Sequence, residues 1–181
     1  MKHIPNMLSI FRIVLIPFFI REMFIGDTYF SALILLASGL TDLLDGYLAR
    51  KFGWISQLGK VLDPIADKLT IVTVCIVLML RLQEYKFYFI VLLLKECIML
   101  VLGANLIKKK IKLEGAKWFG KLSTFSFYFT TILLVFIPLP TWLANILLSV
   151  TTLCAVSAAF QYLPEYSKYK KELKKVLLEE E

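Results

Sequence analysis

Residues 41–70 read TDLLDGYLARKFGWISQLGKVLDPIADKLT and place four aspartates in a chain that is otherwise strongly apolar. Asp42 and Asp45 are three residues apart, and Asp63 and Asp67 are four residues apart. On a helix, either spacing puts the two carboxylates on one face, one turn from each other. Because each pair lies where a polar segment meets a long apolar run, the stretch predicts two neighbouring helices that carry acids near one end.

The four carboxylates would repel one another on neighbouring helices unless cations lay between them, and acids at membrane depth are tolerated when they face a cavity, a partner charge or a metal. Carboxylate oxygens are the ligands that Mg²⁺ and Mn²⁺ prefer. The only histidine, His3, is near the start of the chain, which argues against zinc and histidine catalysis. Helix capping would explain one acid at each helix end, not two on one face. The spacing therefore predicts a carboxylate site for two metal ions at a membrane surface.

The composition predicts a membrane protein with a single domain. Of 181 residues, 59% are hydrophobic and the mean hydropathy is +0.73, whereas soluble domains are roughly 45–50% apolar. The formal charge of +7 suits contact with anionic lipid headgroups. The three cysteines lie in apolar runs, which is typical of packing residues. We expect the lipid bilayer, and no nucleic acid, as a partner.

Six apolar segments reach the length of about 20 residues that a transmembrane helix needs. They cover residues 4–24, 29–48, 59–80, 87–107, 118–137 and 142–163. The first lacks a small-residue cleavage site and is interpreted as a retained span. The sequence therefore predicts an all-α bundle of six transmembrane helices, one membrane-embedded domain over residues 1–181, and a charged tail over 164–181 that forms a solvated or interfacial helix.

The distribution of basic residues predicts the orientation. One set of loops and ends contains most of the basic residues: Lys2, Arg50, Lys51, Lys108, Lys109, Lys110, Lys112, Lys117, Lys168, Lys170, Lys171, Lys174 and Lys175. The other set contains Arg21, Arg81 and Lys86. By the positive-inside rule the first set is cytoplasmic. We therefore expect a multi-pass protein of the cell membrane with both termini and the aspartates on the cytoplasmic side.

The aspartates belong to a longer pattern, D-x-x-D-G-x-x-A-R, eight further residues, then G-x-x-x-D-x-x-x-D. Its fixed positions are Asp42, Asp45, Gly46, Ala49, Arg50, Gly59, Asp63 and Asp67. The pattern resembles the signature of the CDP-alcohol phosphatidyltransferases, with every position filled. The resemblance implies Mg²⁺ or Mn²⁺ as cofactor, two ions, held by Asp42, Asp45, Asp63 and Asp67. It also implies that Asp67 takes the proton from the attacking hydroxyl, that CDP-diacylglycerol is the donor, and that the protein is a homodimer.

The small residues of the pattern have two interpretations. The family places the nucleotide against Gly46, Ala49, Arg50 and Gly59, where missing side chains would let it approach the backbone. Arg50 could then pair with phosphate through its planar guanidinium. Close packing of helices would also select small residues at these positions, and the two interpretations are compatible.

The acceptor alcohol is indicated by two further segments. IPNMLSIFRIVLIPFF (residues 4–19) and GKLST (residues 120–124) resemble bacterial phosphatidylglycerophosphate synthases, which implies glycerol 3-phosphate as acceptor and phosphatidylglycerophosphate and CMP as products. The candidate cations for its phosphate are Arg12, Lys60, Lys117 and Lys121. Lys117 and Lys121 could instead be positive-inside anchors.

One departure leaves the acceptor open. Many of these synthases carry Ala-Arg-Glu in the fourth span, and this chain reads Leu94-Lys95-Glu96. Lysine keeps the charge but loses the bidentate fork of arginine, and Lys95 and Glu96 could simply neutralise each other. Phosphatidylglycerol, as in cardiolipin synthase, inositol phosphate or serine are the alternative acceptors. A non-enzymatic divalent-cation carrier is a more remote alternative, because carriers usually show inverted repeats and the sequence shows none.

Overall fold

The computed structural model describes residues 4–52, 59–108 and 118–179, and all regular structure within these ranges is helical. The α-helices are α1 (Ile4–Phe24), α2 (Thr28–Phe52), α3 (Gly59–Arg81), α4 (Lys86–Lys108), α5 (Trp118–Phe136) and α6 (Thr141–Glu179). A single 3₁₀ turn, Gln83–Tyr85, precedes α4. The prediction of an all-α fold with six helices is confirmed.

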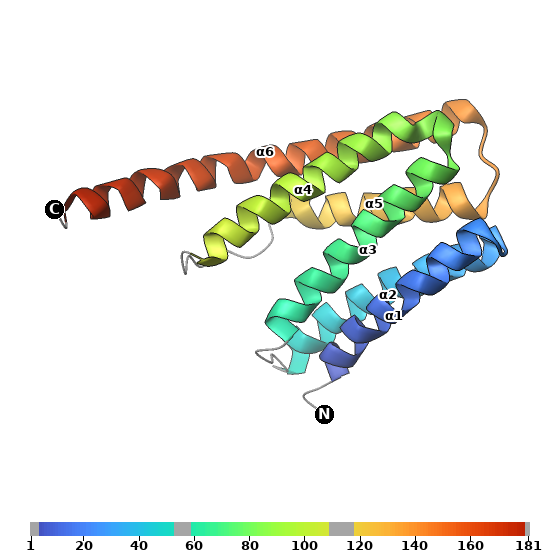
Figure 1. Ribbon diagram of the computed structural model, residues 1–181, viewed down its shortest axis with the longest axis horizontal. Helices are drawn as coiled ribbons and strands as arrows, with labels where there is room; N and C mark the ends of the chain where they lie inside the picture. The colour runs from blue at the N-terminus through green and yellow to red at the C-terminus, as the bar shows by residue number, and fades with distance from the viewer. Residues whose placement is uncertain (1–3, 53–58, 109–117, 180–181) are drawn as a thin grey trace.

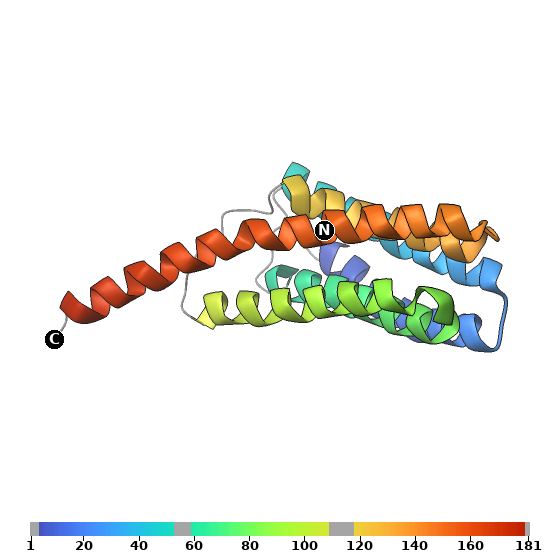
Figure 2. The same ribbon diagram turned by 90° about the horizontal axis from the view of Figure 1, so that it is seen from above.

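The helices pack as a closed ring in two layers. Helix α1 contacts α2 and α3, α5 contacts α2 and α6, and α4 contacts α3 and α6. Seen from above, α1, α3 and α4 form one layer and α2, α5 and α6 form the other (Figure 2). Helix α1 is therefore the neighbour that α2 and α3, the two acid-bearing helices, have in common.

Short connections join α1 to α2, α3 to α4 and α5 to α6, and the two helices of each pair pack against each other. Before α2, the Asp27 carboxylate accepts a hydrogen bond of 2.8 Å from the Tyr29 amide, which caps the helix. Pro138 and Pro140 separate α5 from α6, since proline cannot continue a helix. Because α1, α2 and α3 alternate in direction, the start of α1, the end of α2 and the start of α3 meet at one end of the bundle (Figure 1).

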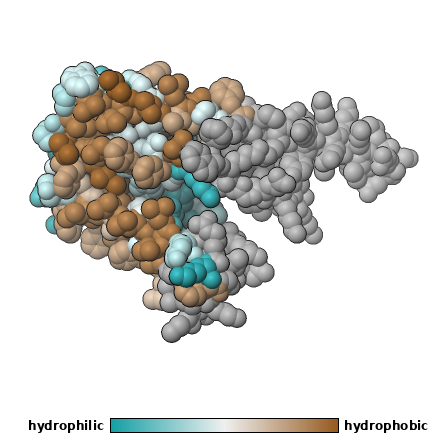
Figure 3. Space-filling model, turned by 180° about the vertical axis from the view of Figure 1, so that it is seen from behind, coloured by the Kyte–Doolittle hydropathy of each residue, from teal (hydrophilic) through white to brown (hydrophobic). Residues whose placement is uncertain are grey.

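The surface of the bundle is rich in large apolar side chains. Met7, Phe18, Leu94 and Leu153 are all more than half exposed, and apolar residues cover most of the visible bundle in Figure 3. In the part of the chain that the structure describes, two helical segments are long and apolar enough to cross a membrane, Thr28–Asp45 and Thr141–Phe160. Crossing of the membrane stays a prediction for all six helices.

Helix α6 differs from the predicted last span in its length. It continues as one helix from Thr141 to Glu179, and its C-terminal part extends well beyond the other five helices (Figure 1). The sequence predicted a span that ends near residue 163 and a separate tail helix. Pro164 lies within α6, so the proline at this point does not end the helix.

Candidate active site

The four aspartates lie at the end of the bundle where α1, α2 and α3 meet. Asp42 and Asp45 belong to α2, and Asp63 and Asp67 belong to the first turns of α3. Both helices contact α1. Asp45 is buried, and the other three are partly buried. The two acidic pairs thus lie at the same end of the bundle, on two helices that each pack against α1.

Helix α1 supplies polar partners to three of these carboxylates. The Ser9 hydroxyl donates a hydrogen bond to Asp63. The two terminal nitrogens of Arg12 donate to Asp42 and Asp45, one to each. The Arg12 side chain is fully buried. A guanidinium presents its donors in a fixed planar fork, so Arg12 joins the two acids of α2 to each other and to α1.

The polar face of α1 was only partly recognised in the sequence. Asn6, Ser9 and Arg12 follow one another at intervals of three residues, and all three are buried. Residues at this spacing lie on one face of a helix. The sequence analysis singled out Arg12 but neither Asn6 nor Ser9. Polar residues repeating every three positions in an apolar segment were the signal that could have identified them.

Asp67 differs from the other three acids in its hydrogen bonding. Its Oδ1 atom is buried and has no hydrogen-bond partner among the described residues. The Tyr128 hydroxyl on α5 is also buried without a hydrogen-bond partner among the described residues. The Tyr128 ring packs against Gly39 of α2, where an added Cβ atom would lie 3.3 Å from the ring. Buried polar atoms are normally satisfied by protein or water. The buried Asp67 oxygen is therefore available to a partner other than the described residues.

The chemistry of the four side chains suits a hard divalent cation, because all four are carboxylates and one has an unpaired buried oxygen. Their positions do not form a complete metal site. Within residues 4–52, 59–108 and 118–179, no three acidic, histidine or cysteine side chains are grouped closely enough to hold one metal ion. The guanidinium of Arg12 holds two of the carboxylates instead. Arg12 takes one oxygen of Asp42 and one of Asp45, so a metal ion at these two acids would have to share them with Arg12.

A second charged cluster lies on the other side of α3. The Lys68 ammonium is 2.6 Å from one carboxylate oxygen of Glu96, and the Lys95 ammonium is 2.5 Å from the other. Glu96 is almost completely buried, whereas Lys68 is about a quarter exposed. The expected neutralisation of Lys95 by Glu96 is present, and Lys68, which the sequence analysis did not consider, takes part in it. We call these three residues the lysine–glutamate cluster.

A small pocket adjoins the lysine–glutamate cluster. It is lined by Ile71 of α3, by residues of α4, α5 and α6, and by the hydroxyl-bearing side chains of Ser123 and Thr124. Lys95 and Glu96 line the same pocket. Ammonium and hydroxyl donors around one pocket suit an anionic group such as a phosphate. The cluster therefore has the opposite chemical preference to the aspartates.

The remaining candidate residues are placed as follows. Gly46, Ala49 and Arg50 belong to α2, and Lys60 belongs to α3. Gly59 is buried at the start of α3. Lys121 is exposed near the start of α5, and Lys117 lies outside the described residues. The structure thus brings Arg12 into direct contact with the aspartates and leaves Lys121 on the surface.

A family model for the CDP-alcohol phosphatidyltransferases matches residues 2–157. The chain belongs to this family. A relative from Rickettsia typhi, named CDP-diacylglycerol–glycerol-3-phosphate 3-phosphatidyltransferase, is 33% identical over 75% of the chain and 77% of the relative. The protein of that name from Escherichia coli K12 is 37% identical over 50% of each chain. A cardiolipin synthase (CMP-forming) from Streptomyces coelicolor is 34% identical over 79% of the chain and 69% of the relative.

Membership in this family of membrane enzymes has two consequences for the site. The chain is an enzyme of the CDP-alcohol phosphatidyltransferase class, so the carrier interpretation of the aspartates is set aside. The matched residues 2–157 include all of α1 to α5, the aspartates and the lysine–glutamate cluster. They stop before the part of α6 that extends beyond the bundle.

Proposed function

We propose that this phosphatidyltransferase moves a phosphatidyl group from CDP-diacylglycerol to glycerol 3-phosphate, giving phosphatidylglycerophosphate and CMP. The observation that carries the proposal is the contrast between two adjoining sites. Four aspartates gather at the end of α1, α2 and α3, and the lysine–glutamate cluster lies on the other side of α3. The names of the Rickettsia and Escherichia relatives support the same donor and acceptor.

Asp42, Asp45, Asp63 and Asp67 would hold two divalent ions, Mg²⁺ or Mn²⁺. When bound, such ions neutralise the charge of a pyrophosphate and stabilise charge on the attacking and leaving oxygens. CDP-diacylglycerol carries a pyrophosphate between its cytidine and its lipid. Gly46, Ala49, Arg50 and Gly59 border these acids along α2 and α3 and would contact the nucleotide.

Asp67 is the residue best suited to move the proton. Its Oδ1 is buried and unpaired within the described part of the chain, so it is available to accept a hydrogen bond from the acceptor hydroxyl. A general base must lie within hydrogen-bond reach of the proton that it removes. In the proposed reaction the hydroxyl oxygen attacks the phosphorus that bears diacylglycerol, the bond from this phosphorus to the oxygen of CMP breaks, and Asp67 takes the proton.

The phosphate of the acceptor would bind at the lysine–glutamate cluster. Lys68 directly follows Asp67 in α3, and Lys95 lines the pocket with Ser123 and Thr124. Lys121 lies in the same helix as those two hydroxyls and is exposed, so it could approach the phosphate from solvent. Lys60 and Lys117 remain further candidates from the sequence. Arg12 already uses both terminal nitrogens on carboxylates.

The proposal includes the placement of the enzyme in the cell membrane. All six helices would span the bilayer with the aspartates and both termini on the cytoplasmic side, where the nucleotide-activated lipid is accessible from water. The exposed apolar side chains of the bundle suit contact with lipid. The enzyme would act as a homodimer, as the family resemblance implies.

The test is release of CMP by the purified full chain with CDP-diacylglycerol, Mg²⁺ and one acceptor at a time. We expect release with glycerol 3-phosphate and little with inositol phosphate or serine. Removal of divalent ions with a chelator should abolish release, and adding back Mg²⁺ or Mn²⁺ should restore it. No release with any acceptor would overturn the proposed reaction.

Cardiolipin synthesis is the second candidate, because the Streptomyces relative covers a similar share of the chain at similar identity. Its acceptor would be phosphatidylglycerol, which offers a hydroxyl but no phosphate monoester. The same assay separates the two candidates. CMP release with phosphatidylglycerol and not with glycerol 3-phosphate would replace the proposed acceptor and keep the donor chemistry.

A further inference from the structure

Arg12 links the two acids of α2 to α1. Its side chain is fully inaccessible to solvent, and its two terminal nitrogens each donate to a different carboxylate, Asp42 and Asp45. Among the described residues, these are the only acids with which it forms ion pairs. A buried guanidinium is stable only when nearby anions compensate its charge. Arg12 and this pair of aspartates therefore depend on each other.

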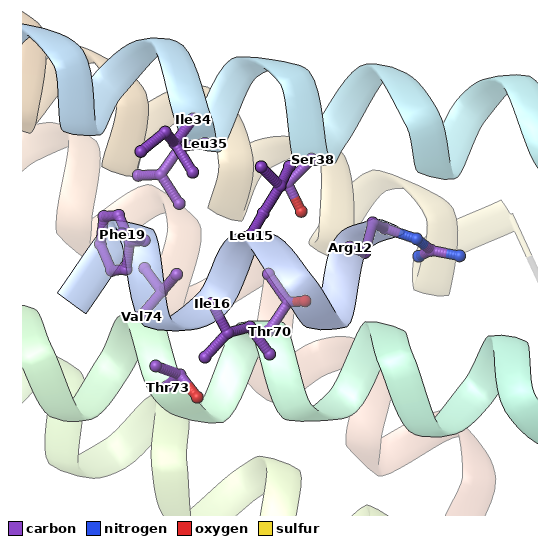
Figure 4. A pocket seen from close by; sticks show the side chains of 10 residues that line it. All are labelled: Arg12, Leu15, Ile16, Phe19, Ile34, Leu35, Ser38, Thr70, Thr73 and Val74. Atoms are coloured by element: carbon purple, nitrogen blue, oxygen red, sulfur yellow. The ribbon is translucent and has the colours of Figure 1, made fainter. Parts of the chain in front are cut away.

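The packing around Arg12 keeps its guanidinium at the acids. The side chain starts at one end of a small cavity between α1, α2 and α3, which is lined mainly by apolar residues such as Leu15, Phe19 and Val74. In Figure 4 the guanidinium points away from these apolar residues, along α1. Turning the guanidinium back would place a charge among apolar side chains, which is costly. The apolar cavity thus keeps the Arg12 guanidinium at the acidic end of the bundle.

Asp42 and Asp45 are also two of the four acids that the proposed function assigns to divalent ions. A carboxylate oxygen that accepts a charge-assisted hydrogen bond has fewer lone pairs to offer to a metal. The positive charge of Arg12 also repels a second cation at short range. Both effects act against an ion at these two acids.

We propose that Arg12 is a built-in counter-ion of Asp42 and Asp45, and that it competes with divalent cations for these carboxylates and so sets the affinity of the site. The inference rests on the metal site of the proposed function. It gives Arg12 a role different from contact with the acceptor phosphate. Arg12 is in this sense a positioning residue that acts through the two aspartates.

The experiment measures Mn²⁺ binding to the purified full chain in detergent, by the loss of the signal of free Mn²⁺ in electron paramagnetic resonance. Wild type is compared with Arg12→Gln, which removes the charge, and Arg12→Lys, which keeps the charge without the fork. Arg21→Gln is the matched control, because Arg21 is an exposed arginine at the other end of α1 that pairs with Glu22.

We expect Arg12→Gln to bind Mn²⁺ about tenfold or more tightly than wild type. The variant loses the charge-assisted hydrogen bonds of Arg12 to Asp42 and Asp45, which compete with the metal ion for these carboxylates. Arg12→Lys should fall between the two, and Arg21→Gln should match wild type. Equal or weaker Mn²⁺ binding by Arg12→Gln would overturn the inference. So would a change of the same size in Arg21→Gln.

Arg12→Gln could fail to fold, since breaking a buried ion pair is strongly destabilising. The comparison then uses Arg12→Lys and thermal unfolding with and without Mn²⁺. The gain in melting temperature on adding Mn²⁺ should be larger for Arg12→Lys than for wild type, and an equal or smaller gain would overturn the inference. Failure of the inference is distinct from failure of the proposed function, which shows as wild type that neither binds Mn²⁺ nor releases CMP.

Discussion

Two charged regions adjoin α3, and they are built in opposite ways. The acidic region has four aspartates and one buried cation, Arg12. The lysine–glutamate cluster has two ammonium groups and one nearly buried carboxylate, Glu96. The first has negative charge in excess and the second has positive charge in excess. This difference in charge is the basis for proposing a cation site in the first region and an anion site in the second.

The division between the two regions follows from helix geometry. Asp67 and Lys68 are consecutive in α3, and consecutive residues of a helix point about 100° apart. Lys68 is directed to Glu96 on α4, while Asp63, one turn before Asp67, contacts Ser9 on α1. A single helix thus separates the proposed cation site from the proposed phosphate site. A reaction between two phosphate-bearing substrates needs both.

The largest expected effect is loss of the base in the acidic region. Asp67→Asn should lower the rate of CMP release by about 10²–10⁴-fold, the usual contribution of a general base. Because the amide cannot take the proton, extra Mg²⁺ should not restore the rate. Asp63→Asn should also inactivate the enzyme, but by weakening metal binding, so extra Mg²⁺ should restore part of the rate. CMP release from saturating substrates over a Mg²⁺ series is the measurement.

Asp27→Asn is the control for both variants. Asp27 caps α2 at the opposite end of the bundle, so its loss should leave the rate of CMP release near that of wild type. Full recovery of Asp67→Asn at high Mg²⁺ would show that Asp67 is a ligand and not the base. The acidic region would then still be a cation site, but the proton acceptor would have to lie elsewhere.

The second effect belongs to the lysine–glutamate cluster. Lys95→Ala should raise KM for glycerol 3-phosphate about ten- to hundredfold, since a hydrogen bond to a charged group contributes roughly 1.5–3 kcal/mol. KM for CDP-diacylglycerol should barely change, because the acidic region is intact. Glu96 keeps Lys68 as a partner in this variant, so the buried carboxylate is not left alone. Initial rates with each substrate varied in turn measure the two constants.

Lys86→Ala is the matched control, because Lys86 is an exposed lysine at the other end of α4. It should leave both constants unchanged. If Lys95→Ala raised KM for CDP-diacylglycerol instead, the assignment of the donor to the acidic region and of the acceptor to the cluster would be wrong. An unchanged KM for glycerol 3-phosphate would move the phosphate site to Lys60, Lys117 or Lys121.

The acidic region shows what local sequence can predict. Helical spacing placed Asp42 with Asp45 and Asp63 with Asp67, because the face of a helix depends only on short-range periodicity. The apolar segments likewise predicted the six helices, which begin close to the predicted starts, although α6 continues well past its predicted end. Both predictions needed no knowledge of how the helices pack.

The contacts between the helices could not be predicted in this way. Ser9 and Asp63 are 54 residues apart, and Lys68 and Glu96 are 28 apart. Which side chains meet depends on the rotation of each helix about its axis, and that rotation is fixed by packing against several neighbours at once. The sequence therefore indicated Arg12 as an unusual charge in an apolar helix but not that it contacts the aspartates.

A smaller effect tests the support that α1 provides to the acidic region. Ser9→Ala removes the hydrogen bond that the Ser9 hydroxyl donates to the Asp63 carboxylate. We expect CMP release at limiting Mg²⁺ to fall by a few-fold and to recover at high Mg²⁺, because the loosened carboxylate binds the ion less well. Ser31→Ala is the control, since the Ser31 hydroxyl donates to the Asp27 carbonyl at the other end of the bundle.

The smallest effect should occur far from both charged regions and sets the background for the others. Thr130 of α5 and Thr151 of α6 share a hydrogen bond of 2.8 Å between their hydroxyls. Thr130→Val should lower the free energy of unfolding by about 0.6 kcal/mol, the average for such bonds between membrane helices. The Thr151 hydroxyl still has the Ser126 carbonyl at 3.4 Å, so the change leaves no buried donor without an acceptor.

Unfolding by SDS in detergent micelles measures the effect of Thr130→Val, with Ser157→Ala as the control because that exposed hydroxyl bonds only within α6. Neither variant should change KM for either substrate or the Mg²⁺ requirement. If Thr130→Val altered those constants as much as Ser9→Ala or Lys95→Ala, then helix packing in general, and not the charge of the two regions, would control the reaction. An effect confined to unfolding leaves the opposite charges of the two regions as the explanation for the larger changes.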